Sequence, residues 1–215
     1  LNQHGNLLER RCGRRLQVTA VSARDKSKDR GVPLEGYEFF EDAAQMAVEA
    51  EADVVFELIG GSDGIAKATV EAAIGAGRHV VTANKALIAH HGTDLAQKAE
   101  TANVTLAYEA AVAGGIPIIK AMREGLAANG ITSIHGILNG TCNYILSRMR
   151  DEDLEFTEVL EDAQRLGYAE VDPGFDIDGV DAAHKLAILA SLAFGREVDF
   201  DAVHIEGIRR ISQMD

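Results

Sequence analysis

The first half of the chain alternates short apolar segments, rich in β-branched residues, with segments of helical periodicity. The apolar segments lie at residues 16–23, 53–59, 79–82 and 104–108, and the helical segments lie at residues 41–50, 62–75 and 93–101. Strands separated by helices indicate a parallel sheet with right-handed crossovers. The run at 53–59 (DVVFELI) is apolar almost throughout, as in a strand buried on both faces. The sequence therefore predicts a doubly wound, parallel α/β sheet in this half.

The second half has a different pattern. Pro117 predicts the start of a helix that reaches about residue 128, because proline is tolerated in the first helical turn. A strand is predicted at 131–138, a Pro/Gly loop at 172–178, and further helices at residues 141–150, 156–166 and 180–194. The last of these helices is apolar almost all round and should be buried. We therefore expect two incomplete domains: a Rossmann-like nucleotide-binding domain at residues 1–113, and an α+β substrate-binding, catalytic and dimerisation domain at residues 114–215.

The composition limits the classes of partner. The 215 residues carry a formal net charge of −13, which argues against general affinity for nucleic acids or membranes. No stretch approaches the ~18 consecutive apolar residues of a transmembrane helix. The two cysteines, Cys12 and Cys142, are far apart and match no metal-ligand spacing, so we expect reduced thiols and a cytoplasmic location.

Two charged residues stand on the apolar helix predicted at 180–194. Asp181 and Lys185 are four residues apart and share one helix face, a spacing that is equally typical of a surface ion pair. Their helical neighbours are mostly apolar, however, and charges on a buried helix are costly unless they are paired or functional. Four carboxylates precede the pair, at Glu170, Asp172, Asp176 and Asp178. Such a cluster is suited to the ammonium group of an amino acid, the alternative being a solvated acidic loop.

Three features of the first half indicate a bound anion or dinucleotide at the carboxyl ends of the strands. Lys85 follows the strand predicted at 79–82, although a surface lysine would fit that position equally well. Gly60 and Gly61 link a strand to a helix, a context that favours an anion, but no GxGxxG motif occurs in the chain. Arg24 lies at the end of the first predicted strand, where an acidic residue usually binds the ribose. An arginine at this position favours NADP(H) over NAD(H), and the adjacent Asp25 weakens that preference.

The glycine-rich turn at 109–117 (EAAVAGGIP) is a further candidate site. Its carbonyl oxygens could hold a hard cation. On these residues alone, a tight crossover between the two domains is the better interpretation.

Five segments together resemble the homoserine dehydrogenase family. They occur in the family's order and spacing across most of the chain: VVTANKAL at 80–87, YEAAVAGGIP at 108–117, ILNGTCNYIL at 137–146, GYAEVDP at 167–173 and DIDGVDAAHK at 176–185. The resemblance implies an NAD(P)-dependent oxidoreductase that interconverts the small molecules L-homoserine and L-aspartate 4-semialdehyde, in threonine and methionine biosynthesis. It also implies a homodimer formed through the second domain.

The resemblance further implies roles for individual residues. Lys185 would be the proton donor or acceptor at the substrate oxygen, and Lys85 would lie beside both nicotinamide and substrate. Substrate-binding positions would be Glu170 and Asp181, with Asp176, Thr141 and Tyr168 completing the pocket. Gly167 would contact the cofactor. A monovalent cation such as Na⁺ would be held, mainly through backbone carbonyls, at Glu109, Val112, Gly114 and Ile116.

The chain departs from the family pattern at both ends. The family's first strand and glycine-rich turn would precede Leu1, and the family continues beyond Asp215, so we expect a fragment of a longer protein. Because the missing strand is central in a doubly wound sheet, two interior strand edges should lack partners. Two alternatives stay open: another amino-acid oxidoreductase, of the aspartate dehydrogenase kind, and a truncated α/β module without catalytic activity.

Overall fold

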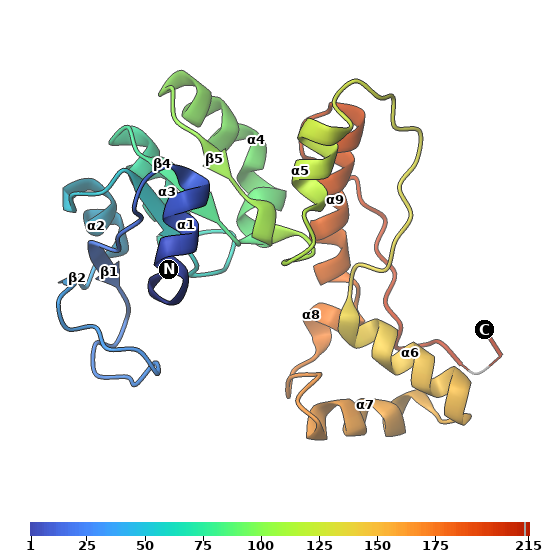
Figure 1. The fold of residues 1–215 in the computed structure, drawn as a ribbon. Helices are drawn as coiled ribbons and strands as arrows, with labels where there is room; N and C mark the ends of the chain where they lie inside the picture. The colour runs from blue at the N-terminus through green and yellow to red at the C-terminus, as the bar shows by residue number, and fades with distance from the viewer. Residues whose placement is uncertain (213) are drawn as a thin grey trace. The chain divides into compact units, whose positions relative to one another are not determined.

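The computed structural model describes residues 1–212 and 214–215, and they divide into two compact units (Figure 1). Unit 1 comprises residues 1–82 and 94–107. Unit 2 comprises residues 83–93 and 108–215.

Unit 1 is built on parallel strands, as predicted. Strand β1 (Ala20–Ser22) pairs with β2 (Glu38–Phe40). A second sheet has the order β3-β4-β5 and consists of β3 (Val54–Glu57), β4 (His79–Thr82) and β5 (Leu106–Ala107). Within the described residues no ladder joins the two sheets, so β1 and β3 each keep one unpaired edge. The separation of the two sheets agrees with the expectation of two unpaired strand edges, although among the described strands β2 and β5 each have one unpaired edge as well.

The helices of unit 1 begin in different ways. A short 3₁₀ turn (Asn2–His4) leads into α1 (Gly5–Cys12). Helix α2 (Ala43–Glu49) begins at Asp42, whose carboxylate accepts the N–H groups of Ala44 and Gln45, a typical N-cap. Helix α3 (Ile65–Gly75) packs against α2, β3 and β4 and buries small side chains such as Ala66 and Ala73.

One prediction for this half was wrong, and one helix was predicted too short. Strand β3 is not buried on both faces: Val55 and Glu57 are buried, whereas Phe56 is 56% exposed, because α3 covers only one face. The helix predicted at 93–101 begins much earlier, since α4 spans Lys85–Thr101. The Asn84 side chain accepts the N–H of Leu87, so this asparagine caps the helix directly after β4.

Unit 2 is mainly helical (Figure 1). A 3₁₀ turn (Glu109–Ala111) precedes α5 (Ile118–Lys120), which continues as a π-helical turn (Ala121–Gly125). The remaining helices are α6 (Gly140–Glu152), α7 (Phe156–Arg165), α8 (Gly174–Ile177) and α9 (Val180–Phe194). Helices α6, α7 and α8 meet in a core that contains Ile145, Val159 and Ile177, each fully buried.

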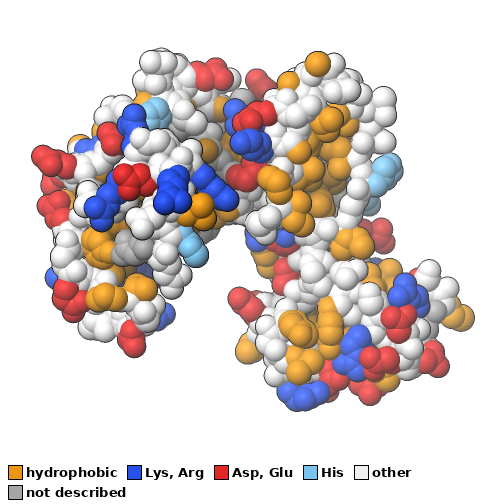
Figure 2. Space-filling model, viewed as in Figure 1, with side chains coloured by type: hydrophobic (Ala, Val, Ile, Leu, Met, Phe, Trp, Pro, Cys, Tyr) orange, Lys and Arg blue, Asp and Glu red, His pale blue; other side chains and the backbone are white. Residues whose placement is uncertain are grey.

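The strand predicted at 131–138 does not form, and this segment is irregular. A strand needs a neighbour to complete its hydrogen bonds, and no described segment pairs with this one. The segment instead borders an apolar cavity of about 740 Å³, shared with α5, α9 and residues 203–206. Figure 2 shows hydrophobic side chains gathered over α5 and α9 on this part of unit 2. Among the described residues, no helix combines the length and apolar character needed to cross a membrane.

Candidate active site

A buried carboxylate between two lysines is the centre of the candidate site in unit 2. Asp181 lies in the first turn of α9 and is only 2% exposed. Its Oδ1 lies 2.6 Å from Lys85 Nζ, and its Oδ2 lies 2.7 Å from Lys185 Nζ. Lys85 is the first residue of α4, and Lys185 follows Asp181 by one helical turn. The predicted pairing of Asp181 and Lys185 therefore forms, and Lys85 joins it.

The protonation state of Asp181 follows from its partners. Burial alone would raise the pKa of this carboxyl, but hydrogen bonds from Lys185, Lys85 and Asn139 outweigh burial and lower the pKa below its ordinary value. Asp181 is therefore ionised at neutral pH. Lys185 Nζ also donates to the carbonyl of Leu138 at 2.7 Å, so a second acceptor holds its ammonium group in place.

Asn139 is a residue of the site that the sequence reasoning missed. Its Nδ2 lies 2.8 Å from Asp176 Oδ1 and 2.8 Å from Asp181 Oδ2. Its Oδ1 accepts the N–H of Cys142 at 2.8 Å and so caps α6. The only signal in the sequence was an asparagine immediately before a predicted helix, which by itself indicates an N-cap and not a bridge between carboxylates.

Close backbone packing fixes the turn between α8 and α9, and with it Asp176 and Asp181. The N–H of Ile208 donates to the carbonyl of Ile177 at 2.8 Å. A Cβ at Gly207 would lie 2.6 Å from that carbonyl oxygen, so only glycine permits this approach. Asp178, grouped with the other carboxylates in the sequence, instead pairs with Arg209 on the surface.

The thiol of Cys142 lies beside the same carboxylates. It donates to the backbone carbonyl of Asp176 at 3.3 Å. Burial, together with the charges of Asp176 and Asp181, raises its pKa to about 11. The thiol therefore stays protonated at neutral pH and is a poor nucleophile.

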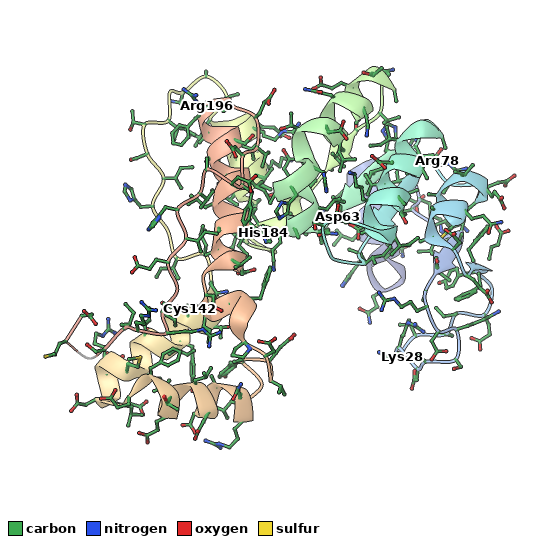
Figure 3. All side chains as sticks on the ribbon, turned by 180° about the vertical axis from the view of Figure 1, so that it is seen from behind. Lys28, Asp63, Arg78, Cys142, His184 and Arg196 are labelled. Atoms are coloured by element: carbon green, nitrogen blue, oxygen red, sulfur yellow. The ribbon has the colours of Figure 1, made fainter. Side chains whose placement is uncertain are left out.

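His184, next to Lys185 on α9, was also missed. The ring is 3% exposed, and it points from α9 toward the first turns of α4 (Figure 3), where its Nε2 lies 3.2 Å from His90 Nε2. Phe200 and Phe175 pack against the ring, with centroids 4.6 and 5.5 Å away. Burial, and then the proximity of His90, lower the pKa of His184 to about 4, so the ring is neutral at pH 7.

The remaining predicted substrate residues lie around the ends of α6 and α7. Thr141 Oγ donates to the carbonyl of Tyr168 at 3.0 Å, and the Tyr168 ring packs on Tyr144 while staying 58% exposed. Gly167 ends α7 with a φ of +78°. Glu170 is exposed, and among residues 1–212 and 214–215 nothing pairs with its carboxylate. The structure thus joins Thr141 to Tyr168 and leaves Glu170 out of the lysine cluster.

The predicted anion-binding residues lie in unit 1. Gly60 and Gly61 follow β3 with φ values of +88° and +83°. The N–H of Gly60 is already bound by the Glu57 carboxylate at 3.2 Å, so this amide is not free for an anion. Arg24 is exposed just after β1, and its guanidinium makes no hydrogen bond or ion pair with a described residue.

The glycine-rich turn has oxygens that are partly occupied. The Glu109 carboxylate accepts the N–H groups of Ile119 and Lys120, at 3.1 and 2.9 Å, and so caps α5. The carbonyl of Ile116 accepts the N–H of Ile118 at 2.8 Å. Val112 is fully buried, and Gly114 follows Ala113, which adopts a φ of +50°. Within the part of the chain that is described, no group of three or more His, Cys, Asp or Glu side chains could hold a metal ion.

Parallel α/β structure in one unit and a buried carboxylate between two lysines in the other place the chain in a class: two-part α/β proteins with a dinucleotide-binding type of fold. A family model described as the NAD-binding domain of homoserine dehydrogenase matches residues 2–109, and one described as homoserine dehydrogenase matches residues 117–215. The chain belongs to the homoserine dehydrogenase family.

Individual relatives agree with this assignment. The homoserine dehydrogenase of Neisseria gonorrhoeae is 48% identical over 215 residues, which cover 100% of this chain and 49% of the relative. The crystal structure of the Thiobacillus denitrificans homoserine dehydrogenase superposes with a TM-score of 0.94 at 46% identity, covering 100% of this chain and 49% of that one. A hyperthermophilic archaeal homoserine dehydrogenase, solved in complex with NADPH, superposes with a TM-score of 0.73 at 30% identity, covering 84% of this chain and 55% of that one. The chain therefore spans about half the length of the relatives it matches, and the Rossmann-like fold class is confirmed.

Proposed function

We propose that the protein containing this chain catalyses NAD(P)-dependent hydride transfer between L-homoserine and L-aspartate 4-semialdehyde. The observation that carries the proposal is the buried Asp181 carboxylate held between Lys85 and Lys185, in a chain that belongs to this family. A nicotinamide cofactor, when bound, exchanges the hydride with the carbinol carbon. The residues of this chain then have to bind the amino acid and move one proton at its oxygen.

Lys185 is the proposed proton carrier. With Asp181 ionised, the ammonium form of Lys185 completes the ion pair, and this form donates a proton to the aldehyde oxygen in the direction of reduction. In the direction of oxidation the neutral amine accepts the hydroxyl proton. The bond to the Leu138 carbonyl restricts where the amine points, which favours one reactive geometry.

Asp176 is the best placed carboxylate for the ammonium group of the substrate. Its Oδ1 accepts from Asn139, whereas its Oδ2 makes no hydrogen bond within the described ranges 1–212 and 214–215. Asp181, by contrast, already has two lysine partners. The exposed Glu170 carboxylate and the exposed face of Tyr168 would complete substrate binding, with Thr141 holding the Tyr168 backbone.

Residues 1–113 are proposed to bind the dinucleotide and residues 114–215 the substrate. The unpaired guanidinium of Arg24 at the end of β1 supports a contact to a 2′-phosphate, and hence NADP(H), which is also the cofactor form in the archaeal complex. The further proposed cofactor contacts are Lys85, the turn at Gly60 and Gly61, and Gly167.

The proposed ligands of Na⁺ are backbone carbonyls, those of Glu109, Val112, Gly114 and Ile116. A cytoplasmic homodimer without nucleic-acid partners completes the proposal; the unlinked cysteines support the location.

The test follows absorbance at 340 nm with L-homoserine and NADP⁺, then NAD⁺, for this chain and for a form extended at both ends to the length of its relatives. We expect the extended form to reduce cofactor. If the extended form is folded by circular dichroism and reduces neither cofactor with L-homoserine, the proposal fails. Reduction with L-aspartate in its place would then favour the aspartate dehydrogenase kind of activity.

A further inference from the structure

Asn139 makes hydrogen bonds to the buried carboxylate of Asp181, the partly buried carboxylate of Asp176 and a helix end. The residue is 8% exposed. Its two amide hydrogens go to Asp176 and Asp181, and its oxygen accepts the N–H of Cys142. Both donors of the amide and one of its acceptor sites are therefore used.

The orientation of this amide is determined by its surroundings. If the nitrogen and oxygen exchanged places, the oxygen would face two carboxylates and the nitrogen would face the backbone N–H of Cys142. All three contacts would become repulsive. The helix cap at α6 therefore forces the NH₂ group toward Asp176 and Asp181.

We infer that Asn139 is a positioning residue. It fixes the Asp181 carboxylate between Lys85 and Lys185, and it keeps the free oxygen of Asp176 available to the substrate. The inference rests on the proposed function. Asn139 acts only through these carboxylates. It allows two negative groups to share one neighbour without adding a charge of its own.

The charges around position 139 explain why a neutral donor is required. Asp176 on α8 and Asp181 on α9 face it directly. Lys185 Nζ donates to the same Asp181 oxygen, Oδ2, and to the carbonyl of Leu138, whereas Lys85 Nζ contacts Asp181 Oδ1. The Cys142 thiol of α6 is protonated, and the buried His184 is neutral. A carboxylate at position 139 would place three negative groups in contact. A serine hydroxyl is shorter than the asparagine amide and would leave both Asp176 and Asp181 without this hydrogen-bond donor.

Two substitutions separate positioning from capping: Asn139→Asp and Asn139→Ser. Both keep an oxygen that can cap α6, and ionised aspartate is at least as good a cap as serine. If capping were the whole role, Asn139→Asp would be at least as stable as Asn139→Ser at neutral pH, and would lose stability relative to it on acidification. The positioning role predicts the opposite order of stability for the two variants. Asn139→Asp should be the less stable variant at neutral pH, and the difference should shrink toward about pH 4 as a shared proton relieves the repulsion.

Urea unfolding of this chain and its two variants, at neutral pH and at about pH 4, measures that difference without any need for activity. Equal or greater stability of Asn139→Asp at neutral pH would overturn the inference. In the extended form, Asn139→Ser should lower kcat with L-homoserine by about 10²-fold. An unchanged kcat would equally overturn it. If the unsubstituted extended form is inactive, the proposed function fails, and the unfolding experiment still decides what Asn139 does.

Discussion

Among the described residues each unit buries one carboxylate, and the two are stabilised by different kinds of partner. Glu57, at the end of β3 in unit 1, is 1% exposed and accepts the N–H groups of Ile59 and Gly60 and the hydroxyl of Thr82. Asp181 in unit 2 is equally buried, but two lysines and one amide surround it. Glu57 is satisfied by neutral dipoles, whereas Asp181 is satisfied by charges.

The difference separates a structural carboxylate from one that belongs to the proposed catalytic site. The partners of Glu57 belong to the turn that follows β3 and to the neighbouring strand β4, so its hydrogen bonds determine the path of the backbone. The partners of Asp181 are ammonium groups at the ends of flexible side chains, 34% and 18% exposed. A lysine that is partly exposed and held against a buried carboxylate can reach a substrate and exchange a proton with it.

The largest effect is expected from Lys185→Ala in the extended form. Because this lysine is the proposed proton carrier, kcat with L-homoserine should fall by about 10²–10⁴-fold in the 340 nm assay. Lys98→Ala is the matched control, because Lys98 pairs with Glu71 and Asp94 on the surface and should not affect the rate. A greater loss of kcat in Lys85→Ala than in Lys185→Ala would transfer the proton-carrying role to Lys85.

A smaller effect, on stability, compares Glu57→Gln with Asp181→Asn. In Glu57→Gln the Thr82 hydroxyl can turn to accept from the new amide, so the free energy of unfolding should change by about 1 kcal/mol or less. Asp181→Asn leaves two ammonium groups without a counter-charge and should cost about 1–3 kcal/mol. This is less than the about 3–5 kcal/mol of a fully buried broken pair, because the lysines can reach water. Urea unfolding at neutral pH measures both variants, and a greater loss in Glu57→Gln would contradict the comparison.

A third effect is expected in the pH dependence of stability. His184 has a pKa of about 4 in the folded chain against an ordinary 6.5, so the unfolded chain binds the extra proton, and stability is lost as the pH falls from 6.5 toward 4. The lowered pKa of Asp181 acts in a separate range: its contribution is complete above the ordinary pKa of 3.8 and is lost as the pH falls through the folded value.

His184→Phe should therefore flatten the upper range and leave the lower range intact, as measured by urea midpoints across the pH series. His135→Gln is the control, because His135 is exposed and outside the cluster. An unchanged slope between pH 6.5 and 4 in His184→Phe would show that another group is responsible.

Predictions that depend on local hydrogen bonds agreed with the structure better than those that depend on distant partners. The helix predicted at 180–194 is α9 (Val180–Phe194), and its Asp181 and Lys185 share a face as their spacing requires. The strand predicted at 131–138 is absent because a strand is completed only by a neighbour. The exposure of Phe56 on β3 likewise depends on which face other elements cover.

The sequence by itself determined the strands and helices from β1 to β5 other than β2, the acid–lysine spacing on α9, and the resemblance that the family comparison confirms. Only the tertiary structure decided which groups meet. It brings Lys85 to Asp181 from a different helix, places Asn139 between two carboxylates 37 and 42 residues away, and leaves Glu170 outside the cluster. Spacing along a helix is set by the period of its own backbone, whereas contacts between elements are set by packing that no short segment contains.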